Sequence, residues 1–316
     1  MIPVPQLLPA LVSGEGVPEL SRELLLLVDV DYDAAPDMTT KEAPKKKQPR
    51  RPGDRSASPT DGKLFDPLTN TAGEIAAIEK LFAQLFETKP GDPYSLIKGQ
   101  TDEAHFRELV PQYRHLHLAT RGFFAGSEYK SAAQSRSSDV SQDRSTLAPA
   151  KPTVVGYNPG LLSGLALAGA NREPVADADD GILTAQEIGV MNLSGVDTVV
   201  LSACDTGLGE TAGGEGLLAV QRAFQVAGAR TTVASFWKVD DLVTRMLMER
   251  FYRNLWEKET SRLDALREAQ LFILNNPDAI RGSDPQPNDP KPPHESALLG
   301  GVYAVGGLAV EILIRP

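Results

Sequence analysis

The single cysteine of the chain is the residue whose type and setting could do chemistry. Cys204 directly follows an apolar, β-branched stretch at 196–202 and precedes a glycine-rich stretch that includes Gly207 and Gly209. Glycines let a backbone turn closely around a thiol. A thiolate in such a turn can attack a carbonyl carbon, and the N–H of Cys204 could hold the resulting oxyanion. A small buried hydrophobe at a strand end fits the same pattern, and spacing alone leaves both interpretations open.

The elements that would position this cysteine follow from the hydrophobic pattern. Continuous apolar runs predict buried strands at 24–32, 115–119, 196–202 and 231–236. Helical spacing predicts helices at 71–86, 101–110, 184–190, 216–228, 243–255 and 263–274. Thr71 and Glu74 have the spacing of a capping box.

Apolar strands that alternate with helices are typical of one architecture. They predict an α/β fold, a mostly parallel sheet with helices on both faces. In such sheets, sites lie beyond the carboxyl ends of the strands. Two of these predicted ends carry polar clusters, at 120–123 and 202–209.

Two stretches interrupt the pattern. Residues 34–60 are rich in Pro, Lys, Arg and Ser, and residues 127–151 are rich in Ser and charges. Few apolar groups are available there to offset the cost of ordering, so both are predicted to be disordered insertions. The organisation that we predict is an N-terminal segment at 1–23 and one domain at 24–316. The basic run at 45–51 could touch nucleic acid, but a solvated insertion is the interpretation we favour.

Composition and charge limit the partners and the compartment. The net charge of -10 disfavours nucleic acid and anionic membranes. The longest apolar run, at 24–28, is far shorter than a membrane span. A lone cysteine cannot form an internal disulfide, which fits a reducing cytoplasm, and residues 1–15 lack the pattern of a signal peptide. Ligand spacing for a metal and a phosphate-binding loop are both missing from the sequence, so no cofactor is expected.

Several motifs, in order along the chain, resemble the CHAT family. They include Leu-Ala-Thr-Arg-Gly at 118–122 and Ser-Ala-Cys-Asp-Thr-Gly at 202–207. Further matching stretches stand at 162–171, 180–184, 214–224, 227–229 and 234–240. The resemblance covers about 24–275, with the two insertions interrupting it. It implies a caspase-like fold of peptidase clan CD, related to separase, whose characterised members are cysteine endopeptidases with a His/Cys dyad.

The resemblance also assigns roles to residues. Cys204 would be the nucleophile, and the N–H groups of Gly122 and Cys204 would form the oxyanion hole. The base histidine of the family falls at Arg121, and a guanidinium, which has donors and no acceptor, neither takes nor gives up a proton usefully near neutrality. Its charge can still favour a thiolate. We therefore expect a weak or inactive peptidase, or a pseudo-peptidase that serves as an interaction or regulatory module; an α/β hydrolase-like domain for a nonpeptide ligand is a third possibility.

The remaining polar residues have two interpretations each. The chain has four histidines, His105, His115, His117 and His294, and none is a convincing substitute base. His115 and His117 are predicted to pack within the sheet layer, since four residues of strand put His117 about 13 Å from position 121. Three carboxylates near the presumed cleft could bind a basic substrate side chain, as in related Arg-specific peptidases, or could be solvated or cap a helix: Asp205, Glu210 and Asp240. The expected partner is a peptide or a protein.

The C-terminal part departs from the family. CHAT domains usually end in an aromatic-rich strand, whereas 297–316 contains Tyr303 as its single aromatic residue. We predict that 309–314 still acts as an edge strand. A fragment of a longer gene, in which TPR-type repeats often precede this domain, and a diverged copy are both compatible with this ending.

Overall fold

A six-stranded sheet is the centre of the structure, a computed structural model that describes residues 22–35, 65–68, 71–87, 92–124, 129–131, 154–157, 159–172, 179–202, 215–235, 241–276 and 303–306. The strand order is β11-β10-β9-β3-β1-β2. The strands are β1 (Arg22–Val30), β2 (Tyr94–Lys98), β3 (Tyr113–Leu118), β9 (Thr198–Leu201), β10 (Thr231–Ser235) and β11 (Tyr303–Gly306). All neighbours pair in parallel except β11, which is antiparallel to β10.

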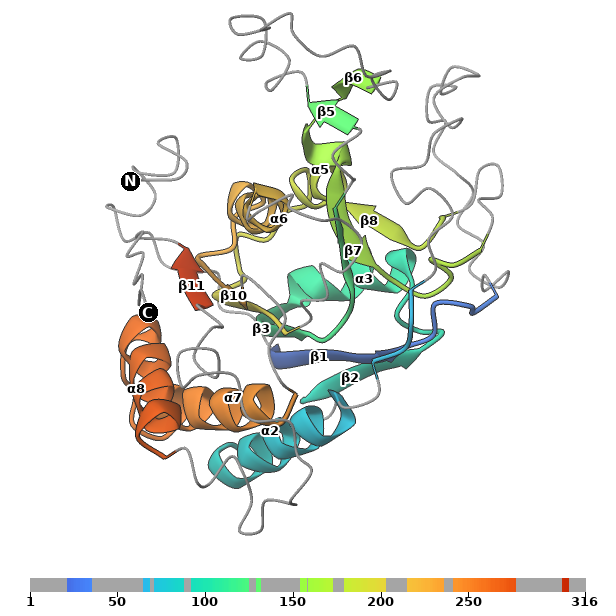
Figure 1. The fold of residues 1–316 in the computed structure, drawn as a ribbon. Coiled ribbons are helices and arrows are strands. Elements are labelled where there is room, and N and C mark those ends of the chain that lie inside the picture. Colours follow the sequence, from blue (N-terminus) through green and yellow to red (C-terminus); the bar gives the residue numbers. More distant parts are fainter. Residues whose placement is uncertain are drawn as a thin grey trace, which may run out of the picture.

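Helices cover both faces of this sheet (Figure 1). One face packs against α2 (Thr71–Leu85), α7 (Asp241–Trp256) and α8 (Arg262–Asn275). The other packs against α3 (Glu103–Leu109), α5 (Ala185–Ile188) and α6 (Glu215–Val226). Strand β1 shows why its run is apolar throughout: Leu24 and Leu26 enter one core while Leu25 and Leu27 enter the other. The predicted α/β fold, with a mostly parallel sheet covered on both faces, is confirmed.

Two smaller sheets extend the fold. An antiparallel sheet of order β4-β7-β8 contains β4 (Gly122–Phe124), β7 (Ser163–Ala166) and β8 (Ile182–Thr184). The pair β5 (Tyr129–Ser131) and β6 (Val154–Tyr157) is parallel, and 3-10 turns stand at Val110–Gln112 and Pro159–Leu161. Strand β5 lies inside the insertion predicted at 127–151, so that insertion is not wholly without regular structure. The rest of it, and nearly all of 34–60, lie outside the described residues.

Helix caps are described at α3 and α5, and the one capping box that was predicted, at α2, is not observed. Thr71 and Glu74 do not form the predicted capping box of α2. The Thr71 hydroxyl donates to the Leu68 carbonyl, and the Glu74 carboxylate is buried in the core. At α3, Asp102 is the N-cap, and its side chain accepts from the N–H of His105. A complete capping box forms at α5, between Thr184 and Glu187.

The observed edge strand near the C-terminus is not the predicted one. Strand β11, at Tyr303–Gly306, pairs with β10 at the sheet edge. The residues predicted for this role, 309–314, lie outside the described part of the chain.

The first prediction concerns Gly164 in β7, which pairs with Phe123 of β4. An added Cβ would overlap the Leu183 carbonyl oxygen and lie 2.5 Å from the Phe123 ring. We expect Gly164→Ala to lower the free energy of unfolding by about 2 kcal/mol, because backbone and ring cannot both move away. Urea denaturation measures this change.

Gly99→Ala is the matched control. A Cβ at Gly99 would have Ala34 Cβ as its nearest neighbour, at 3.7 Å. It should change the free energy of unfolding by less than about 1 kcal/mol. Equal effects of the two substitutions would contradict the close packing of β4, β7 and β8.

Candidate functional site

The carboxyl ends of β3 and β9 meet at one edge of the sheet. The two strands are adjacent and parallel, with Leu118 beside Leu201 in the register. The N–H of Ser202 donates to the Leu118 carbonyl at 3.0 Å. The chain therefore approaches position 204 beside the segment that carries Arg121, as expected for parallel strands of such a sheet.

Four of the predicted site residues lie beyond what the structure describes: Cys204, Asp205, Glu210 and Asp240. Arg121 and Gly122 are described. Arg121 stands between β3 and β4, and Gly122 is the first residue of β4, where it pairs with Leu165 of β7. The structure thus gives the surroundings of one half of the predicted dyad.

A chain of hydrogen bonds fixes the backbone at Arg121. The Thr120 hydroxyl donates to the Ala166 carbonyl, and the Tyr32 and Thr120 hydroxyl oxygens are 3.2 Å apart. The N–H of Arg121 donates to the Tyr32 hydroxyl at 3.0 Å, and the Arg121 carbonyl accepts from the N–H of Ala166 at 2.8 Å. Burial raises the pKa of Tyr32 above its ordinary value, so its phenol stays protonated and can donate onward to Thr120.

The Arg121 side chain is half-buried and turns toward the segment at 65–68. Its Nε donates to the Asp66 carbonyl at 3.0 Å. A guanidinium presents donors and no acceptor, so this side chain can bind carbonyl or carboxylate oxygens. It can supply charge at the strand end, but it cannot accept a proton from a thiol.

Two of the described histidines, His115 and His117, lie in the body of β3, before this strand end. His117 is fully buried within β3, with Nδ1 3.0 Å from the Tyr252 hydroxyl. Burial lowers the pKa of His115 to about 4, so its ring is neutral at pH 7. His105 lies on α3 with Nδ1 2.7 Å from the Asp102 carboxylate. The prediction that His115 and His117 pack within the sheet layer is confirmed, and His294 is outside the described residues.

Sequence reasoning missed the buried carboxylate of Glu74. The residue is 4% exposed, and Oε1 accepts from the Ser202 hydroxyl at 2.6 Å. The same oxygen is 3.2 Å from Nε2 of His117, close enough for a charge contact although not aligned as a hydrogen bond. A signal was present, since Glu74 shares the apolar helical stripe with Ile78 and Leu81.

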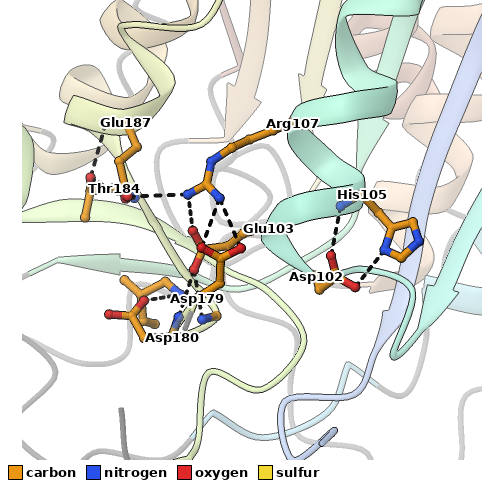
Figure 2. A network of polar contacts seen from close by, with 10 residues as sticks. Asp102, Glu103, His105, Arg107, Asp179, Asp180, Thr184 and Glu187 are labelled. Atoms are coloured by element: carbon orange, nitrogen blue, oxygen red, sulfur yellow. Dashed lines mark hydrogen bonds and ion pairs between the residues drawn. The ribbon is translucent and has the colours of Figure 1, made fainter. Parts of the chain in front are cut away.

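A second polar cluster supports the smaller sheet (Figure 2). Glu103 of α3 accepts from the N–H groups of Asp180 and Gly181 at 3.1 and 3.0 Å, and it also pairs with Arg107. Arg107 in turn contacts Asp179 and Glu187. Gly181 has φ +75 and no room for a Cβ beside Ala170, so this turn needs glycine.

This second cluster is a clamp rather than a metal centre. Arg107 occupies its middle, and within the described ranges no group of three or more His, Cys, Asp or Glu side chains is arranged to hold a metal ion. The clamp holds α3 against the turn before β8, and β8 pairs with β7, the neighbour of β4. It therefore supports the sheet that begins at Gly122.

The fold and its polar strand ends define an α/β protein of the caspase-like type. The family model of the CHAT domain matches residues 10–294. The chain therefore belongs to the CHAT domain family, a caspase-like, peptidase-related family. Comparison with curated proteins finds no match. No helix among the described residues has the length and apolar character needed to cross a membrane.

The second prediction concerns the pH dependence of stability. Burial raises the pKa of Glu103 from 4.5 to about 8, and the charge of Asp179 adds to this effect. Between these values the folded protein holds a proton that the unfolded chain has released. The free energy of unfolding should therefore fall as pH rises from about 4.5 to about 8.

Glu103→Gln tests this assignment, because an amide can accept the same two N–H groups but does not titrate. We expect the wild type to lose urea resistance relative to Glu103→Gln between pH 5 and pH 8. Glu108→Gln, an exposed position on the same helix, is the control and should follow the wild-type profile. Parallel profiles of wild type and Glu103→Gln would show that Glu103 is ionised throughout this range.

Proposed function

We propose that this CHAT-family chain is a pseudo-peptidase that binds a peptide or protein segment without hydrolysing it at a useful rate. The observation that carries the proposal is Arg121 at the end of β3, where the resemblance puts the family histidine. Cys204 keeps the position of the nucleophile, and Gly122 keeps that of an oxyanion donor. We propose a cytoplasmic location, because a lone cysteine fits a reducing compartment.

Hydrolysis of a peptide needs two proton transfers that arginine cannot perform. A base must take the proton of the thiol, and an acid must protonate the leaving amine. If the sulfur of Cys204 attacks a carbonyl without that acid, the tetrahedral adduct expels the better leaving group, the thiolate, and returns the intact peptide. The guanidinium charge of Arg121 still favours the thiolate.

The described histidines support this interpretation. His117 precedes Arg121 by four strand residues, about 13 Å of chain. His115 is further back and is neutral at pH 7, and His105 is paired with Asp102. His115 and His117 therefore stand too far back along β3 to replace the base at the strand end.

Binding would use the edge where β3 and β9 end. We propose that Asp205, Glu210 and Asp240 form an acidic side of this edge that accepts a basic side chain of the bound segment. Cation-binding carboxylates fit a role in recognition that needs no turnover. The partner class is accordingly a peptide or protein with Lys or Arg.

An active peptidase is the second candidate, and membership of the CHAT family favours it. It would require the charge of Arg121 alone to favour the Cys204 thiolate, with the thiol proton released to water, and the leaving amine to take its proton from water. Both hypotheses share the nucleophile and differ in turnover.

The third prediction separates these two functions. A mixed peptide library incubated with the full chain should show no cleavage above that of Cys204→Ala. Arg121→His should cleave about a hundredfold or more faster than the Cys204→Ala background, the size of general acid–base catalysis. Arg114→His, which puts a histidine on the same strand at a position that is 47% exposed, is the control and should stay inactive.

Two results would count against the proposal. Cys204-dependent cleavage by the wild-type chain would establish the active peptidase. Failure of Arg121→His to gain activity would show that the missing base is not the only lesion in the site.

The fourth prediction concerns the thiolate. Iodoacetamide should alkylate Cys204 of the wild type quickly at pH 7, because a nearby cation lowers a thiol pKa. Arg121→Gln should slow the reaction at pH 7 by about tenfold, and Arg121→Lys should retain most of it. Equal rates for all three chains would show that Arg121 does not act on Cys204.

A further inference from the structure

A buried polar chain links α2 and α7 to both strands of the predicted site. Glu74 of α2 accepts from the Ser202 hydroxyl at 2.6 Å, and Nε2 of His117 is 3.2 Å from the same carboxylate oxygen. On its other side, Nδ1 of His117 is 3.0 Å from the Tyr252 hydroxyl of α7. Glu74, His117 and Tyr252 are at most 4% exposed. One carboxylate thus contacts β3 and the residue that follows β9.

Stability alone gives little reason for a carboxylate at this place. The surrounding cluster is apolar and includes Ile75, Ile78 and Val200. Burial of a charge costs several kcal/mol, and replacing a buried ion pair by apolar residues is often neutral or stabilising. The contacts of Glu74 therefore suggest that it positions the two segments that it touches, at Ser202 and His117.

We propose that Glu74 is a positioning residue for Cys204, acting through Ser202. This inference deepens the proposed function and rests on it, since it takes Cys204 as the thiol of the site. Ser202 precedes Cys204 by two residues, a span of at most about 7 Å. The hydrogen bond to Glu74 fixes where the chain leaves β9, and so limits where the thiol can stand.

Glu74 has a second contact, with His117. This histidine lies in β3, four residues before Arg121, and Tyr252 holds its other ring nitrogen. Since Glu74 contacts both Ser202 and His117, a shift of one strand along the other would break a contact. The carboxylate therefore aligns the strand that leads to the nucleophile with the strand that leads to Gly122.

The chain contains a matched control on the same helix. Glu79 of α2 accepts from the Ser95 hydroxyl at 2.5 Å, which ties the helix to the edge strand β2. This pair has the same chemistry, but β2 does not carry any of the predicted site residues. Substitutions at Glu79 and Ser95 thus report the general effect of losing a helix–strand hydrogen bond.

The experiment compares two reactions of Cys204 in the full chain. Iodoacetamide needs only a thiolate, so its alkylation rate reports access and ionisation. A mixed pool of N-acetyl dipeptide aldehydes forms a hemithioacetal, whose oxyanion needs an aligned N–H donor, and protects the thiol from iodoacetamide. The aldehyde concentration that gives half protection reports alignment.

The alignment of the Cys204 thiol with the N–H donor should be lost in Ser202→Ala and in Glu74→Ala. We expect both to raise the half-protecting concentration by about tenfold or more, with the alkylation rate less affected. Glu74→Gln keeps an acceptor for the Ser202 hydroxyl and should stay within about threefold of the wild type. Because Ser202 and Glu74 act as one unit, the double variant should lose no more than either single variant. Glu79→Ala and Ser95→Ala should match the wild type.

Three outcomes would overturn the inference, and they differ in what else they overturn. If the half-protecting concentration changes equally in the Glu74 and Glu79 variants, Glu74 has no special positioning role, and the proposed function is unaffected. A wild-type Cys204 that is alkylated but never protected by the aldehydes would show that there is no alignment for Glu74 to provide. A wild-type Cys204 that resists iodoacetamide up to pH 9 would overturn both this inference and the reactive thiol of the proposed function.

Discussion

The parallel pairing of β3 with β9 is the interaction on which the site depends. Leu118 lies beside Leu201, and the N–H of Ser202 donates to the Leu118 carbonyl. The segments that follow the two strands therefore leave the sheet side by side. Side chains alternate along a strand, and a slip of one residue would turn His117 or Ser202 to the opposite face. Apolar cores on both faces oppose such a slip, since every residue of either strand would exchange one core for the other.

The sequence was sufficient for the six described helices and for four strands of the central sheet, β1, β3, β9 and β10, and insufficient for the other strands and for the arrangement of the elements. Strands β1, β3 and β9 were predicted because strands buried on both faces are continuous apolar runs, and α2 and α7 because their apolar residues recur at helical spacing. The strand order could not be predicted in this way, because apolar runs of similar character do not specify their neighbours. The three residues of β5 were missed because a Ser-rich stretch carries little hydrophobic signal.

The site shows the same division between local and long-range information. Arg121 and Gly122 could be located from residue types and motif resemblance. Their partners could not, since Asp66 and Tyr32 are 55 and 89 residues away in the chain. Glu74 was interpreted as a helix cap because that rule uses residues three apart, whereas burial against Ser202 and His117 decided its role. Tertiary contacts overrode a local preference at the place where the fold supports the site.

The way in which Tyr32 holds position 121 separates the fold from the chemistry. The phenol contacts the backbone N–H, and Ala166 pairs with the backbone carbonyl, so neither contact depends on which side chain the residue carries. An imidazole and a guanidinium could alternate there without a change in the strand end. A scaffold of this kind can lose or regain a proton-transfer group in a single substitution while remaining folded, which leaves binding and turnover free to evolve separately.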